Sequence, residues 1–129
     1  MKEKTEKLSI YRGHVYMADL DPVKDNEQGG IRPVLVVQNR VGNMNAPTII
    51  VAPLTSQLKV PMPTHVEFMN PEGEINTILL EHLRSISRSR FRRYKWTLDS
   101  TTMNMVDAAI AVSVGLIPLP PAPAFQLNK

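Results

Sequence analysis

The residues best suited to chemistry lie in and after residues 25–34, which read DNEQGGIRPV. Glu27 can accept a proton, and Arg32 can neutralise a phosphate and stabilise a pentacoordinate transition state. Thr48, which begins the apolar run TIIVAPL, can offer a hydroxyl hydrogen bond. These groups would serve a metal-free ribonuclease, because the 2′-hydroxyl of RNA is itself the nucleophile. The spacing equally allows a loop salt bridge between Glu27 and Arg32, with Thr48 only starting a strand.

Two glycines separate the carboxylate from the arginine. Gly29 and Gly30 allow the backbone to turn sharply or to approach a ligand closely. Arg32 stands just before the apolar run PVLVV, so a buried strand would hold its head group at the exit of the loop. No Lys-Ser or Lys-Thr pair follows the glycines, so the loop does not match a nucleotide phosphate-binding loop.

Positive charge is concentrated in the basic segment, residues 84–96, which reads RSISRSRFRRYKW and contains no acidic residue. The chain has 15 basic and 12 acidic residues, so outside this segment the acidic residues are in excess. Arginines interleaved with Phe91, Tyr94 and Trp96 suit a nucleic acid, because guanidinium groups bind phosphates and rings stack on bases. A charge run also fits a solvated turn or helix whose aromatic side chains lie in the core.

Composition narrows the class of protein. A chain of 129 residues is long enough for one domain, and its 43% hydrophobic and 21% charged residues are typical of globular proteins. No run of about 18 apolar residues predicts a membrane helix, and the N-terminus, MKEKTEKLSI, is not a secretory signal. The absence of cysteine excludes disulfides and favours a cytoplasmic location.

The sequence predicts no metal and no cofactor. The three histidines, His14, His65 and His82, are scattered without metal-ligand spacing, and a lone histidine on a strand is more often structural. Motifs for nucleotide phosphates, dinucleotides and a nucleophilic serine are also missing.

Short apolar runs separated by turn residues predict strands, and one late amphipathic segment predicts a helix capped by Asp99 or Ser100 and ended by Gly115. We expect a flexible extension over residues 1–10, one domain over 11–118 and a proline-rich tail over 119–129. The residues between the second and third strands, VGNMNAP, predict a turn-rich connector. The fold class is therefore α+β with a small, strongly curved, barrel-like sheet. The predicted strands cover residues 13–20, 33–39, 48–54, 64–69 and 75–87, and the helix covers 98–116.

Four stretches resemble the MazF/PemK-like toxins, the endoribonuclease halves of bacterial toxin–antitoxin modules, and in particular the Gram-positive MazF type. They read GHVYMADLDP, NEQGGIRPVLVVQN, APTIIVAPLT and ILLEHLRSI, and the resemblance runs from Tyr11 to Ile117. It implies a CcdB/MazF-like SH3-like β-barrel with a C-terminal helix, acting as a homodimer. It further implies metal-free cleavage of single-stranded RNA to 2′,3′-cyclic phosphate and 5′-hydroxyl ends, and an acidic MazE-like antitoxin as partner.

The same resemblance implies roles for individual residues. Arg32 matches the catalytic arginine, Thr48 the catalytic threonine, and Glu27 a loop carboxylate implicated in some members. The glycine loop would then act as a mobile jaw around the scissile phosphate. His82 stands where close relatives carry a glutamine that helps to read an RNA base, and His14 stands where many have an acidic residue. The RNA-binding residues implied are Gln28, Gly29, Gly30, Thr55, His82, Arg84 and Arg88.

Two other functions use the same fold. CcdB-type toxins bind a protein and cleave nothing, but they rely on a C-terminal Trp-Gly-Ile end, whereas this chain ends FQLNK and keeps Arg32 and Thr48. A non-catalytic nucleic-acid-binding module of the SH3 type would need only the basic segment.

Overall fold

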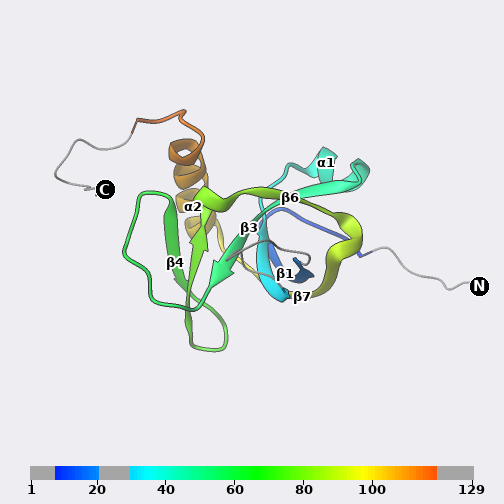
Figure 1. Cartoon of the computed structure of the whole chain (residues 1–129), viewed down its shortest axis with the longest axis horizontal. Helices are drawn as coiled ribbons and strands as arrows, with labels where there is room; N and C mark the ends of the chain where they lie inside the picture. The colour runs from blue at the N-terminus through cyan, green and yellow to red at the C-terminus, as the bar shows by residue number, and fades with distance from the viewer. Residues whose placement is uncertain (1–7, 21–29, 119–129) are drawn as a thin grey trace, which may run out of the picture.

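The computed structural model describes residues 8–20 and 30–118. Seven antiparallel strands form one curled sheet in the order β4-β5-β3-β2-β1-β7, and β6 pairs with β3 outside this path. Figure 1 shows the helix α2 lying against the β4 side of this sheet. The α+β prediction with a C-terminal helix is confirmed. The elements are β1 (His14–Asp19), β2 (Ile31–Val36), α1 (Arg40–Asn45), β3 (Thr48–Thr55), β4 (His65–Met69), β5 (Ile75–Leu79), η1 (Leu80–His82), β6 (Arg84–Ser87), η2 (Arg88–Arg90), β7 (Phe91–Thr97) and α2 (Ser100–Ser113).

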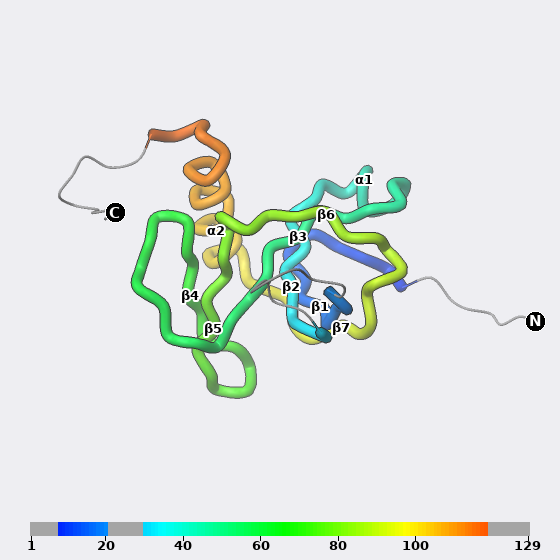
Figure 2. Tube along the Cα trace, in the orientation of Figure 1, coloured from blue at the N-terminus to red at the C-terminus, as the bar shows by residue number. Residues whose placement is uncertain are grey.

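The longest strand, β3, organises the sheet. One of its edges pairs with β2, while the other pairs with β6 over Thr48–Val51 and with β5 at Leu54 and Thr55. Because two different strands share one edge of β3, the sheet bends there, and the trace in Figure 2 follows this bend. The start of β3, at Thr48, therefore lies beside β6, whereas its end, at Thr55, lies beside β5.

Both faces of the central strands are buried, which explains why their sequences are continuous apolar runs. Alternate residues point to opposite faces, so Val34 and Val36 join one core cluster while Leu35 joins the other. The cluster that contains Leu35 also includes Trp96 and is covered by Val106 and Ala109 of α2. Each fully buried aliphatic side chain of this kind stabilises the fold by about 1.5–3 kcal/mol relative to exposure.

The predicted helix is confirmed as α2. The Asp99 side chain accepts a hydrogen bond from the Thr102 backbone N–H at 2.8 Å, and this bond lowers the pKa of the Asp99 carboxyl. The helix is followed by Gly115 at φ 84°, a conformation that favours glycine.

The predicted turn-rich connector is wrong, because residues 40–45 form the short helix α1. The Asn39 side chain caps it by accepting a hydrogen bond from Gly42 N at 2.8 Å, and buried Asn43 donates to Gln38 O at 2.9 Å. Asparagine favours turns and helix caps alike, so its abundance here did not distinguish the two.

Candidate active-site groove

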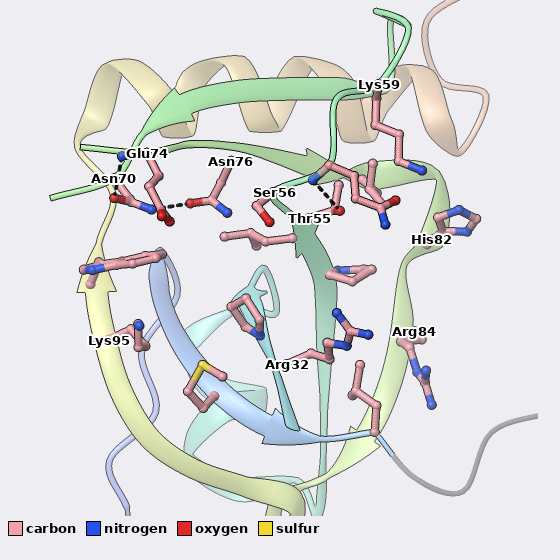
Figure 3. A pocket seen from close by; sticks show the side chains of 18 of the residues that line it. Arg32, Thr55, Ser56, Lys59, Asn70, Glu74, Asn76, His82, Arg84 and Lys95 are labelled. Atoms are coloured by element: carbon pink, nitrogen blue, oxygen red, sulfur yellow. Dashed lines mark hydrogen bonds between the residues drawn. The ribbon is translucent and has the colours of Figure 1, made fainter. Parts of the chain in front are cut away.

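A groove of about 1260 Å³ runs across the ends of several strands. It is bounded by β2, the end of β3, the β4–β5 hairpin and η1, with Trp96 of β7 at its side. Figure 3 shows Arg32, Thr55, His82 and Arg84 lining the same hollow. The groove thus brings together four of the residues that the sequence singled out.

Strand pairing explains why Arg32 and Thr55 line the same groove. Strands β2 and β3 are antiparallel, with Val34 opposite Pro53 and Leu35 opposite Ala52. The pairing ends at Val34 and Pro53, so Arg32, near the start of β2, and Thr55, at the end of β3, both lie just beyond the same end of this paired stretch. Both residues line the groove.

Thr48 lies at the opposite end of β3, seven residues or about 23 Å from Thr55. It pairs with Ser87 of β6, is exposed and does not line the groove. The hydroxyl that shares the groove with Arg32 is therefore that of Thr55, not that of Thr48. The sequence interpretation chose the threonine that begins the strand, but antiparallel pairing brings the strand's end to the start of β2.

The Thr55 hydroxyl is oriented by its neighbour. Its oxygen accepts a hydrogen bond from the Gln57 backbone N–H at 3.1 Å. A hydroxyl oxygen that is already an acceptor can still donate its hydrogen, so Thr55 can offer an O–H to a ligand in the groove.

Arg32 is accompanied in the groove by Arg84 from β6 and by Lys59 from the β3–β4 loop. These cations come from three separate parts of the chain, and the fold gathers them. Lys59 was not anticipated from the sequence, because it stands alone among apolar residues in a proline-rich loop.

Three of the six basic residues of the basic segment support the fold. The Arg88 guanidinium donates to the carbonyl oxygens of Asn43 and Ala46, so it holds α1 and lies outside the groove. Arg90 donates to the Asp19 carbonyl at 3.0 Å, and Arg92 forms an ion pair with the Asp19 carboxylate at 3.2 Å.

The aromatic residues of this segment are divided between the core and the surface. Phe91 and Trp96 are buried in the two core clusters, while Tyr94 is half exposed. The alternative that placed these rings in the core is correct for Phe91 and Trp96. The charge run itself forms two strands, β6 and β7, joined by the short 3-10 helix η2.

His82 lies on the groove wall beside a partly exposed hydrogen-bond network. Its Nε2 is 3.8 Å from Glu81 Oε2. The Glu81 carboxylate also accepts hydrogen bonds from His65 Nε2 at 2.9 Å and from the Thr64 hydroxyl at 3.0 Å. Partial burial raises the pKa of the Glu81 carboxyl, but these hydrogen bonds outweigh it and hold the pKa below its ordinary value.

His14 lies outside the groove, among aromatic rings. Its Nδ1 is 3.3 Å from the Tyr16 hydroxyl, and it contacts the rings of Tyr11 and Tyr94. Partial burial lowers the pKa of His14. The residue therefore belongs to a structural cluster at the β1–β7 pair.

The glycine loop is described only at its end. Glu27, Gln28 and Gly29 lie outside the described residues, as does the proposed jaw. Gly30 adopts φ 77°, and its carbonyl accepts a hydrogen bond from Leu20 N at 2.9 Å. This bond closes the base of the loop and fixes where β2, and therefore Arg32, begins.

Within residues 8–20 and 30–118, no group of three or more His, Asp or Glu side chains is arranged to hold a metal ion. Over the same ranges, no helix is long and apolar enough to cross a membrane.

The fold of the chain is similar to that of several solved structures. The chain is 26% identical to MazF from Deinococcus radiodurans, with a TM-score of 0.73 over 84% of this chain and 98% of that one. A Mycobacterial endoribonuclease solved with its cognate antitoxin is 24% identical, with a TM-score of 0.72 over 86% and 99%. A MazE–MazF complex from D. radiodurans is 25% identical, with a TM-score of 0.70 over 85% and 99%. The curled sheet with its C-terminal helix is therefore the MazF/CcdB-like fold.

The family is identified by a sequence model. Residues 11–114 match the model of the PemK-like, MazF-like toxins of type II toxin–antitoxin systems. The chain belongs to this family, which includes endoribonucleases.

Proposed function

We propose that this protein is the toxin of a type II toxin–antitoxin module and that it cleaves single-stranded RNA in the groove. The observation that carries the proposal is that Arg32 and Thr55 line one hollow, which Lys59 and Arg84 also line. Three cations beside one hydroxyl donor suit a phosphodiester, whose charge increases on the way to the transition state.

The proposed reaction uses the substrate's own nucleophile. The ribose 2′-oxygen forms a bond to phosphorus, the bond from phosphorus to the 5′-oxygen breaks, and the products are a 2′,3′-cyclic phosphate and a 5′-hydroxyl. One proton leaves the 2′-hydroxyl for a base, and one is delivered to the departing 5′-oxygen. This route requires no metal-bound water, because the nucleophile is part of the RNA.

Arg32 would neutralise the non-bridging oxygens as they gain charge, and Thr55 would donate its O–H to one of them. We assign to Thr55 the role that the resemblance gave to Thr48. Glu27 remains our candidate for the base. Gln28, Gly29 and Gly30 would contact the RNA from the loop.

The test is to incubate the purified protein with single-stranded RNA in EDTA. Cleavage leaving cyclic phosphate ends supports the proposal, and a matched RNA with a 2′-deoxy group at the cut site should stay intact. Binding without cleavage would indicate a non-catalytic module. A protein that does not bind RNA and does not cleave it would favour the alternative of a CcdB-like toxin directed at a protein.

We further propose a homodimer and an acidic antitoxin as partner. The Mycobacterial endoribonuclease and the D. radiodurans MazF were each solved with an antitoxin, which supports such a partner. The groove has a cationic end that an acidic segment could occupy, and that occupation would block RNA. Binding should then weaken as salt increases.

A further inference from the structure

The far end of the groove is chemically unlike the end that holds Arg32. The β4–β5 hairpin contributes two asparagines, Asn70 and Asn76, whose exposed fractions are only 3% and 5%. Two exposed carboxylates, Glu72 and Glu74, and the ammonium of Lys95 lie around them. We call this group the amide end of the groove.

Hydrogen bonds fix the orientation of both amides. Asn70 Oδ1 accepts from the backbone N–H groups of Glu72 and Glu74, at 2.8 and 3.1 Å. Its Nδ2 must therefore be the donor toward Asn76, whose Oδ1 lies 2.6 Å away. This leaves Asn76 Nδ2 as the atom that faces the groove, and Figure 3 shows it pointing away from Asn70 and toward Ser56.

Asn76 Nδ2 forms no hydrogen bond with any residue in the described ranges. The side chain is nearly buried, but Nδ2 itself still reaches the groove, so Asn76 presents a donor of fixed direction to an acceptor on a ligand. The hairpin turn is already satisfied by Asn70 alone. The exposed donor of Asn76 therefore has no evident role in holding the turn.

The amide end of the groove suits a nucleobase better than it suits a phosphate. Glu72 and Glu74 outnumber Lys95, and Lys95 is already engaged, 3.6 Å from the Glu72 carboxylate and 4.7 Å from the centre of the Trp96 ring. A phosphate would meet excess negative charge here, whereas it meets three cations at the Arg32 end. A base carbonyl is neutral and accepts a hydrogen bond.

We propose that the amide end of the groove is a subsite for a keto base of the RNA, uracil or guanine, read by Asn76 Nδ2. The carbonyl O4 of uracil or O6 of guanine accepts from the amide. Cytosine and adenine present an amino group at the same place, so the base and the Asn76 amide would both offer N–H donors and no hydrogen bond would form. This inference rests on the proposed function and names a specificity residue outside the catalytic end.

The position of the subsite fits an RNA strand that is cut at Arg32. Thr55 pairs with Thr77 across β3 and β5, so Asn76 is next to the residue opposite Thr55. Strand β5 is two strands away from β2, a separation of about 10 Å. The base read by Asn76 would therefore belong to a nucleotide near the scissile phosphate rather than to a distant part of the strand.

The test uses an isosteric exchange of donor for acceptor. Asn76→Asp keeps the size of the side chain and the hydrogen bond from Asn70 but presents an oxygen to the groove. Asn104→Asp on the exposed surface of α2 makes the same chemical change elsewhere and serves as the control. Each protein cleaves a randomised RNA pool, and the ends are sequenced. We expect a preference of about tenfold for uracil or guanine at one position, lost or reversed only in Asn76→Asp.

A second measurement needs no variant. The unmodified protein cleaves an RNA with uridine or guanosine at the preferred position and matched RNAs with pyrimidin-2-one riboside or 2-aminopurine riboside, which lack the O4 or O6 acceptor. We expect about tenfold slower cleavage of the analogues. An unchanged motif in Asn76→Asp, or equal rates on the analogues, would overturn the subsite while leaving the proposed function intact. Failure of the unmodified protein to cleave any RNA would overturn both.

Discussion

Two threonines on one strand provide a direct test of the active site. Thr55 shares the groove with Arg32, whereas Thr48 lies about 23 Å away on the same strand. Thr55→Val removes the hydroxyl and keeps the shape of the side chain. If that hydroxyl donates to a charged phosphate oxygen, its loss should slow cleavage about 10- to 100-fold, from the 1.5–3 kcal/mol typical of such bonds. Thr48→Val should leave the rate unchanged.

The stability of the variants must be separated from their activity. Thr55→Val also loses the hydrogen bond from Gln57 N, at a cost of about 1 kcal/mol, which should lower Tm by only a few degrees. Thr48 is exposed, so its substitution should change stability by less than about 0.5 kcal/mol. Single-turnover cleavage of single-stranded RNA at 25 °C would measure the chemical step with both proteins folded. A slow Thr48→Val protein beside a fully active Thr55→Val protein would refute the assignment.

Three further predictions concern other groups in the groove. Arg32→Ala should reduce cleavage more than Thr55→Val, about 100- to 1000-fold, since it removes a charged contact; a wild-type rate would contradict this. Glu81→Gln should destabilise the protein near neutral pH, and because the folded pKa of Glu81 is lowered, the difference in Tm should shrink as pH falls below 4.5. His82→Gln should change base preference at one position of the sequenced cleavage motif, because an amide and a neutral imidazole differ in donors and acceptors.

Much of the fold follows from the sequence because the strands are buried on both faces. Runs such as PVLVV and TIIVAPL cannot stay exposed, and the turn residues between them limit where each strand ends. The helix α2 was predictable for a different reason: its cap at Asp99 and the glycine after it mark both ends. The residues that could be predicted are those whose own type restricts their backbone or their burial.

Residues whose role depends on pairing between distant strands could not be placed in this way. Thr48 and Thr55 are the same residue type in one strand, and only the arrangement of the strands in space shows which of them shares the groove with Arg32. Arg84 and Arg88 are similarly close in the sequence, yet one lines the groove and the other holds the helix α1. The charge of the basic segment was visible, but the partners of each arginine were not.

The two ends of the groove suggest how one small domain could both cut and select its RNA. Arg32, Lys59 and Arg84 would attract any phosphodiester, because charge alone carries no sequence information. Discrimination between bases needs a donor of fixed direction, and Asn76 offers one because Asn70 holds it. If the subsite is confirmed, exchanging the asparagine should alter which RNA is cut more than how fast a preferred RNA is cut. The ratio of rates on two bases, rather than the rate on either, is therefore the quantity that separates selection from catalysis.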